Sequence, residues 1–127
     1  MTNERNAKKI LIVEDGKELL LSLSILLKSQ GYLTIGAPDA LFGISLAHKE
    51  RPDLIILDLG LPAGGGFYVL ESINDSIETN DIPVMILTGQ QGIELEEKAR
   101  KMGVAAYLHK PFEPKELLSR VKEILDR

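Results

Sequence analysis

Ile10-Leu11-Ile12-Val13-Glu14-Asp15 is the stretch that decides the fold, because an unbroken apolar run stops there at two acids. Runs of β-branched and leucine residues of this length are typical of strands buried on both faces, as in parallel sheets. Three further runs end at a residue that can do chemistry: Leu54–Leu57 before Asp58, Val84–Leu87 before Thr88, and Ala105–His109 before Lys110. In an open parallel sheet, ligands bind beyond the carboxyl ends of the strands. We therefore expect these reactive side chains at one edge of one sheet.

Segments with helical periodicity alternate with these runs, which predicts an α/β fold. Helices are expected over residues 16–30, from a cap at Asp39 to about Glu50, over 67–77, over 93–102, and onward from Pro114. Residues 32–37 form a weaker run that suits an edge strand, and residues 60–66 form a glycine-rich loop. Because crossovers between parallel strands are right-handed, we expect a doubly wound, flavodoxin-like sheet of five parallel strands in the order 2-1-3-4-5.

The predicted helices differ in how much apolar surface they offer. Leu21 and Ile25 widen the apolar side of the first helix, and Leu41 and Phe42 are among the apolar residues of the second. The helix over residues 93–102 is mostly charged and offers few apolar side chains to a core. It should therefore be the helix that moves most easily.

The composition limits the class of protein. With 127 residues the chain is expected to form a single domain (1–127), of which residues 1–8 are a polar N-terminal tail. A net charge of −4 with scattered basic residues gives no reason to expect direct nucleic-acid or membrane binding. The chain has no cysteine for disulfides or thiolate metal sites, and no signal peptide or membrane span is apparent. We therefore expect a cytoplasmic protein.

Three acids at the predicted edge, Glu14, Asp15 and Asp58, carry like charges that need compensation. Two carboxylates about 4 Å apart repel by roughly 4 kcal/mol at an effective dielectric constant near 20. A cation must balance this repulsion, or the acids must take up protons. Oxygen ligands without histidine or cysteine beside them favour Mg²⁺, which also binds phosphate oxygens. The sequence therefore predicts a magnesium site, with Lys110 at the same edge.

The order of the reactive residues resembles that of the receiver domains of two-component response regulators. The resemblance rests on Glu14-Asp15 after the first strand, Asp58 after the third, Pro62 and Gly66 in the next loop, Thr88-Gly89 after the fourth, and Tyr107 followed by Lys110-Pro111-Phe112. It covers essentially the whole chain. Each motif is short, but the set in this order and spacing is specific. The resemblance leaves open whether the receiver stands alone or is excised from a longer protein.

The resemblance implies a phosphorylation site. Asp58 would be the phosphoacceptor, attacking the phosphohistidine of a histidine kinase or phosphotransfer protein. Asp15, Glu14, Asp58 and the backbone carbonyl of Gly60 would hold Mg²⁺. Together with the metal, Lys110 would neutralise charge on the transferring phosphoryl group. The family usually has a cis peptide bond before the proline that follows this lysine.

The resemblance also implies a switch. Thr88 would donate its hydroxyl to a phosphoryl oxygen, and Tyr107 would turn inward when it does so. Phosphorylation would then shift the surface formed by the fourth helix, the fifth strand and the last helix. An unknown downstream protein or output domain would bind this surface, and a phosphorylation-dependent dimer is left open. His48 and His109 are expected to be exposed, and to be neither metal ligands nor phosphodonors.

Two alternatives stay open beside a phosphorylation-controlled switch. The chain could be the receiver module of a larger transcriptional regulator or hybrid kinase, or a small Mg²⁺-dependent phosphotransferase or phosphatase. Enzymes of that second class with an aspartyl nucleophile commonly need another acid two residues on, where this chain has Gly60. We therefore expect a phosphoacceptor that assists its own phosphorylation and dephosphorylation, and no enzyme with a separate substrate. Gly60 also has no side chain to position water, so autodephosphorylation should be slow.

Overall fold

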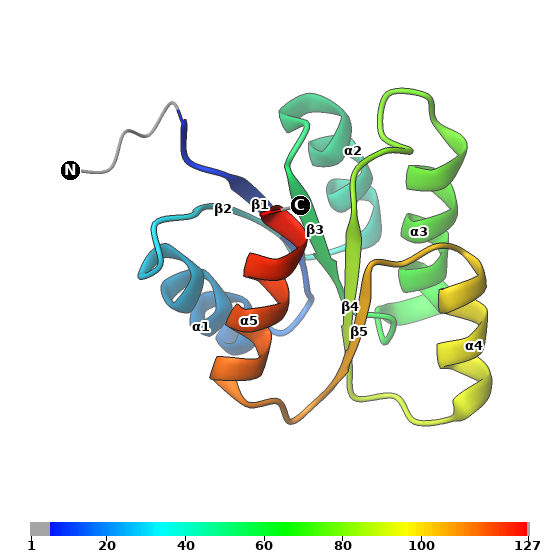
Figure 1. Cartoon of the computed structure of the whole chain (residues 1–127). Helices are drawn as coiled ribbons and strands as arrows, with labels where there is room; N and C mark the ends of the chain where they lie inside the picture. The colour runs from blue at the N-terminus through cyan, green and yellow to red at the C-terminus, as the bar shows by residue number, and fades with distance from the viewer. Residues whose placement is uncertain (1–5, 127) are drawn as a thin grey trace.

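The computed structural model describes residues 6–126, in which five strands alternate with five α-helices (Figure 1). The elements are β1 (Lys9–Val13), α1 (Lys17–Lys28), β2 (Leu33–Ala37), α2 (Ala40–Glu50), β3 (Leu54–Leu57), the 3₁₀ turn η2 (Pro62–Gly64), α3 (Gly65–Asp75), β4 (Val84–Thr88), α4 (Ile93–Lys101), β5 (Ala106–His109) and α5 (Pro114–Leu125). All neighbouring strands pair in parallel, in the order β2-β1-β3-β4-β5. The predicted doubly wound fold is confirmed.

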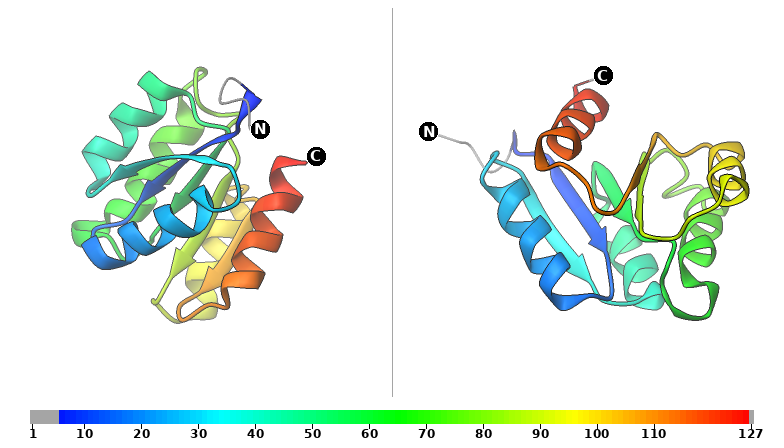
Figure 2. Two further views of the ribbon diagram at one scale, coloured as in Figure 1. Left: turned by 90° about the vertical axis from the view of Figure 1, so that its left-hand side faces the viewer. Right: turned by 90° about the horizontal axis from the view of Figure 1, so that it is seen from below.

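The sheet separates two apolar layers. Helices α1 and α5 cover one face, and α2, α3 and α4 cover the other (Figure 2). Successive residues of β1 point to opposite layers: Ile10 and Ile12 pack with the first group of helices, and Leu11 and Val13 with the second. Both faces of the central strands are therefore buried, which explains why their sequences are apolar without alternation.

Some apolar residues of α1 and α2 lie outside the core. Leu21 and Ile25 on α1 are exposed, and so are Leu41 and Phe42 on α2. In α2 the buried residues are Gly43 and Ala47, and Ala40, Ile44 and Leu46 pack against the core partly buried. A Cβ atom added to Gly43 would lie 2.9 Å from the methyl groups of Val13, so α2 can sit this close to β1 only because of that glycine. Leu41 and Phe42 lie outside this contact and remain exposed.

The segment after β3 is more ordered than the predicted loop over residues 60–66. It forms η2, and α3 begins at Gly65 and ends at Asp75, two residues earlier at each end than expected. A Cβ atom on Gly66 would lie 2.4 Å from the Cα atom of Leu59 and 2.7 Å from the carbonyl oxygen of Asp58. The first turn of α3 thus rests directly on the backbone that carries Asp58. A positive φ of 70° at Gly64 forms the N-terminal cap of this helix.

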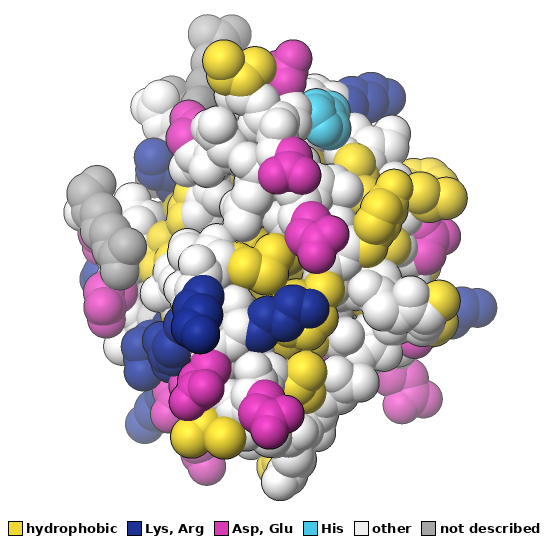
Figure 3. Space-filling model, turned by 90° about the vertical axis from the view of Figure 1, so that its right-hand side faces the viewer, with side chains coloured by type: hydrophobic (Ala, Val, Ile, Leu, Met, Phe, Trp, Pro, Cys, Tyr) yellow, Lys and Arg dark blue, Asp and Glu magenta, His cyan; other side chains and the backbone are white. Residues whose placement is uncertain are grey.

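The face of the molecule formed by α3 and α4 carries side chains of mixed character. On the side formed by α3 and α4, acidic and basic side chains are interspersed with apolar ones (Figure 3). His48 and His109 are exposed, as predicted. Among the helices within residues 6–126, none has the length and apolar character that crossing a membrane requires.

Replacing Gly66 with alanine should destabilise the fold by at least about 2 kcal/mol, because the added methyl group meets backbone atoms that cannot yield. Gly64→Ala is the matched control. The added Cβ atom introduces strain at a positive φ but has no other atom within 4 Å. This variant should therefore lose about 1 kcal/mol of unfolding free energy. Urea unfolding followed by circular dichroism measures both free energies. Equal losses in the two variants would contradict the close-packing argument.

Candidate functional site

Three carboxylates meet where β1 and β3 end, at the lower edge of the sheet in Figure 1. One oxygen each from Glu14, Asp15 and Asp58 lies within 4.8 Å of the others. The strand register brings them together, because Val13 pairs with Leu57 and the Asp58 N–H donates to the Val13 carbonyl at 3.1 Å. Glu14 and Asp58 are only 5% and 7% exposed, whereas Asp15 is open to solvent. The structure thus gathers all three predicted acids.

The ammonium group of Lys110 lies between the two buried carboxylates. Its Nζ is 2.8 Å from Glu14 Oε1 and 3.1 Å from Asp58 Oδ2. Burial disfavours the charged lysine, but the hydrogen bond to Glu14 and the negative charge of Asp58 outweigh this and hold the pKa of Lys110 above its ordinary value. The resulting stabilisation is present at neutral pH and is lost only as the pH rises through that raised pKa. The Lys110–Pro111 peptide bond is cis, as expected.

Backbone N–H groups complete the support of both carboxylates. Gly16 donates to Glu14 Oε2 at 2.9 Å, and Gly60 donates to Asp58 Oδ1 at 2.8 Å. Each buried acid therefore receives one backbone hydrogen bond and one from Lys110. A Cβ atom at either glycine would come within 3.1 to 3.3 Å of the same carboxylate oxygen. The absence of a side chain at these two positions leaves room for the carboxylates, a consequence that the sequence analysis missed.

Thr88 lies at the same edge, at the end of β4. It is fully buried at the end of β4, where its hydroxyl oxygen accepts a hydrogen bond from the Gln90 N–H at 3.1 Å. Its carbonyl accepts from the Lys110 N–H at 2.8 Å. Within residues 6–126, no hydrogen bond joins the Thr88 hydroxyl to the carboxylates or to the Lys110 ammonium group. Thr88 is thus linked to the site through the backbone of Lys110.

Tyr107 faces inward from β5 and belongs to the core layer of α2, α3 and α4. Its ring meets that of His109 edge-on, with 5.3 Å between ring centres. Its hydroxyl is buried and has no hydrogen-bond partner among the described residues. Burial and the charge of Glu96 raise the pKa of this hydroxyl. The predicted switch residue is therefore held in place by apolar packing and not by a hydrogen bond.

A cluster of charged side chains attaches α4 to its neighbours. Glu96 forms an ion pair with Arg100 at 2.8 Å, and its other carboxylate oxygen lies 3.4 Å from the Nε2 atom of His109. Lys98 lies over the ring of Phe67, 4.1 Å from its centre. Sequence reasoning did not find this cluster, because its members come from three separate elements. Ala99 is the buried residue of α4, so the helix is held mainly through its surface, as its composition predicted.

The donor set fits a divalent cation. Three carboxylates face a single ammonium group, which leaves two negative charges at a partly buried site. The ligands on offer are all oxygens, and the sequence has no cysteine. This combination suits Mg²⁺ better than zinc or copper.

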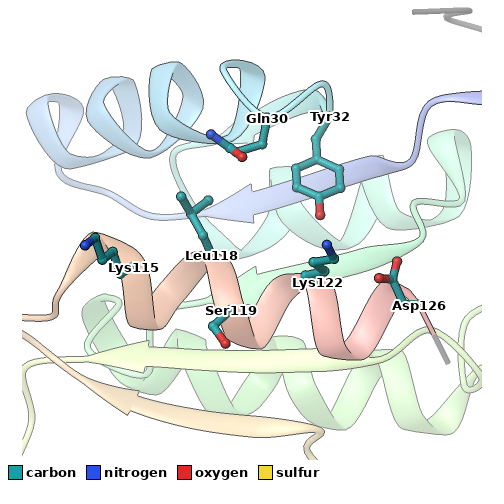
Figure 4. A pocket seen from close by; sticks show the side chains of 7 residues that line it. All are labelled: Gln30, Tyr32, Lys115, Leu118, Ser119, Lys122 and Asp126. Carbon is teal, nitrogen blue, oxygen red and sulfur yellow. The ribbon is translucent and has the colours of Figure 1, made fainter.

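Two hollows open on the surface of the described chain. One, of about 500 Å³, borders the acids through Asp15. The other, of about 480 Å³, lies along α5 beside the end of α1 (Figure 4). It is lined by Gln30, Tyr32, Lys115, Leu118, Ser119, Lys122 and Asp126. Because this lining includes none of the three clustered acids, the second hollow is separate from the site.

Comparison with known protein families matches residues 10–122 to the response regulator receiver domain. The match covers most of the chain, and the chain therefore belongs to the response regulator receiver domain family. The resemblance seen in the sequence is confirmed. Receiver domains of this family are the phosphoacceptor switches of two-component signalling, and histidine kinases phosphorylate them.

Curated relatives include two transcriptional regulators. The phosphate regulon transcriptional regulatory protein PhoB of Escherichia coli is 33% identical over 121 residues, which are 95% of this chain and 53% of PhoB. The DNA-binding dual master transcriptional regulator RpaA of Synechocystis is 39% identical over 94% of this chain and 49% of RpaA. The chain spans about half the length of these relatives.

Solved structures agree with the fold over nearly the full chain. A CheY-like receiver domain protein from Methanospirillum hungatei gives a TM-score of 0.89 at 30% identity, covering 95% of both chains. A putative response regulator from Chloroflexus aurantiacus also gives a TM-score of 0.89, at 32% identity, over 96% of this chain and 100% of the other. The flavodoxin-like arrangement is thus shared with solved receiver domains.

Replacing Lys110 with methionine should destabilise the metal-free protein at pH 7 by about 1–3 kcal/mol, because two buried carboxylates lose their shared cation. The loss should shrink toward alkaline pH, because the native chain itself loses the ammonium charge as the pH rises through the raised pKa of Lys110. Adding Asp58→Asn to the variant should recover part of the stability. Urea unfolding at pH 7 and at alkaline pH, in the presence of EDTA, measures the free energies of unfolding. The exposed Lys101→Met is the control, and an equal loss from that variant would contradict the prediction.

Proposed function

We propose that Asp58 accepts a phosphoryl group from the phosphohistidine of a histidine kinase or phosphotransfer protein. The observation that carries this proposal is the buried Asp58 carboxylate, held by Gly60 at Oδ1 and by Lys110 at Oδ2 beside two further acids. Both contacts fix the orientation of the carboxylate, as a nucleophile requires. Family membership supports the same chemistry.

The transfer is a displacement at phosphorus. A carboxylate oxygen of Asp58 forms a new P–O bond while the P–N bond of the phosphohistidine breaks. The departing ring nitrogen keeps the electron pair and takes up a proton, and the product on this chain is an acyl phosphate. Lys110, already 3.1 Å from the carboxylate, stabilises the negative charge on the phosphoryl oxygens.

Glu14, Asp15, Asp58 and the backbone carbonyl of Gly60 would hold Mg²⁺. When bound, the ion would neutralise charge on the phosphoryl oxygens and on the acids themselves. Asp15 is the most accessible of the three acids, and Lys110 makes no contact with it among the ion pairs of the described residues. We therefore assign the first metal contact to Asp15, with Glu14 alongside or through a water.

The response to phosphorylation would pass through β4 and β5 to α4. Lys110 shares a backbone hydrogen bond with Thr88, and Thr88 pairs with His109, whose ring meets both Tyr107 and Glu96. A phosphoryl group that draws the Thr88 hydroxyl and the Lys110 ammonium toward it would disturb this connection. Helix α4, with a single buried residue, is the element most easily shifted.

A second reading concerns the context of the receiver. PhoB and RpaA are transcriptional regulators about twice as long as this chain. A larger transcriptional regulator is therefore the setting that these relatives favour for the same switch. The phosphorylation chemistry is identical in either setting.

Incubation with acetyl phosphate and Mg²⁺ should add the mass of one phosphoryl group to the intact chain. Asp58→Asn should abolish the adduct, because an amide cannot attack phosphorus. Asp81→Asn, at an exposed acid outside the cluster, should leave it unchanged. EDTA should strongly reduce labelling, since two negative charges at the site are then unbalanced. Labelling that persists in Asp58→Asn would overturn the assignment of the phosphoacceptor.

The phosphorylated chain should lose its phosphoryl group slowly, with a half-life of minutes or longer in Mg²⁺. Gly60 has no side chain that could hold water against the acyl phosphate, and its N–H is bonded to Asp58. Intact mass measured over time, after removal of the phosphodonor, gives the rate. Decay within seconds would show that another group activates the water.

A further inference from the structure

The second hollow, of about 480 Å³, lies between α5 and the residues that follow α1 (Figure 4). Its volume is in the range of sites that hold a molecule of metabolite size. The phosphorylation chemistry proposed above makes no use of it. Gln30 and Tyr32 line one side. The lining residues on the other side recur at helical spacing and so share one side of α5: Lys115, Leu118, Ser119, Lys122 and, at the C-terminal cap, Asp126.

Lysine side chains make this hollow positively charged, although the chain carries a net charge of −4. Lys115 and Lys122 stand two helical turns apart on α5, about 10 Å along its axis. Asp126 is the only acid in the lining, so the two lysines leave an excess of one positive charge. Among the ion pairs within residues 6–126, neither lysine has an acidic partner. An anionic ligand would balance this charge.

Lys115 is placed unfavourably for the helix itself. It is the second residue of α5, near the positive end of the helix dipole, which stabilises acids and not lysines. Glu116 in the same turn suits the dipole but does not line the hollow. At the hollow, the lysine and the start of the helix attract an anion together. The position of Lys115 is therefore better explained by anion binding than by helix stability.

Hydroxyl groups and an apolar surface accompany the lysines. Among the described residues, the hydroxyl groups of Tyr32 and Ser119 take part in no side-chain hydrogen bond. Burial and the charge of Asp126 raise the pKa of the Tyr32 hydroxyl, so this group stays protonated and can donate. Leu118 lies between the two lysines on α5, opposite Gln30 and Tyr32 (Figure 4). The hollow thus offers contacts to a charged group, to polar atoms and to an apolar body.

We propose that this hollow binds a small organic anion, in which a phosphate or carboxylate group is joined to an apolar body. The anionic group would lie at Lys115, because Asp126 offsets the charge of Lys122 at the other end of the hollow. The apolar body would pack on Leu118 and on the Tyr32 ring. Bound in this way, the molecule would link α5 to the segment that follows α1. Because α5 belongs to the surface expected to respond to phosphorylation, the ligand would give the domain a second input.

The test titrates naphthyl phosphate into the isotope-labelled chain and follows the amide signals by two-dimensional NMR. This probe joins a phosphate group to an apolar ring system, whereas inorganic phosphate and naphthol each carry only one of the two parts. EDTA keeps metal ions away from the carboxylate cluster, so that the phosphate group is not drawn there. Lys115→Gln removes the charge that the proposal requires. Lys49→Gln, at an exposed lysine of α2, is the control with the same net charge.

We expect saturable binding of naphthyl phosphate with a Kd below about 1 mM, and the largest amide shifts at Gln30, Tyr32 and Ser119. Inorganic phosphate and naphthol should each bind at least about 10-fold more weakly, because each makes only part of the contacts. Lys115→Gln should raise the Kd of naphthyl phosphate about fivefold, and Lys122→Gln should raise it less. The control Lys49→Gln should leave this Kd unchanged.

The other outcomes of the titration would overturn the inference. No saturation up to about 10 mM naphthyl phosphate would show that the hollow is not a binding site, and so would amide shifts centred on another surface. An equal Kd in Lys115→Gln and Lys49→Gln, or naphthol binding as tightly as naphthyl phosphate, would show that the hollow does not recognise an anion. None of these measurements depends on labelling of Asp58, so the proposed function is tested separately.

Discussion

The rest of the structure depends on the contact between the Lys110 ammonium group and the buried carboxylates of Glu14 and Asp58. Two acids that are almost excluded from water would repel strongly without a shared cation. The lysine lies 96 residues from Glu14 and 52 from Asp58 along the chain, so the contact exists only when the whole sheet has assembled. Folding and the reactive site are therefore linked through one charge.

Close backbone packing fixes the positions of the carboxylates that Lys110 contacts. Gly66 lets α3 rest on the segment that carries Asp58, and Gly43 lets α2 rest on β1. Gly16 and Gly60 leave room beside the carboxylates and bond to them through their N–H groups. At these four positions a side chain would push apart the layers or crowd an acid. Glycines therefore stand where the backbone and the carboxylates of this edge come closest to their neighbours.

The elements that would carry the signal are packed less closely. Helix α4 buries Ala99 and is otherwise attached by surface charges, and Tyr107 has a buried hydroxyl without a partner in the described part of the chain. Because α4 buries little apolar surface, a change at Lys110 and Thr88 can shift this helix at a small cost in free energy. The molecule thus combines closely packed backbone around Asp58 with a helix, α4, that buries little apolar surface.

The sequence by itself determined the strand order, the gathering of Glu14, Asp15 and Asp58, and the family, because apolar runs that end at reactive residues allow few other arrangements. It could not determine which helix faces are buried. Leu41 and Phe42 have the spacing of core residues, yet the close fit of Gly43 on Val13 leaves them outside. It also could not predict the pairing of Lys110 with Glu14 or the tight first turn of α3. These features depend on distances between residues far apart in the chain, and only the packed tertiary structure sets such distances.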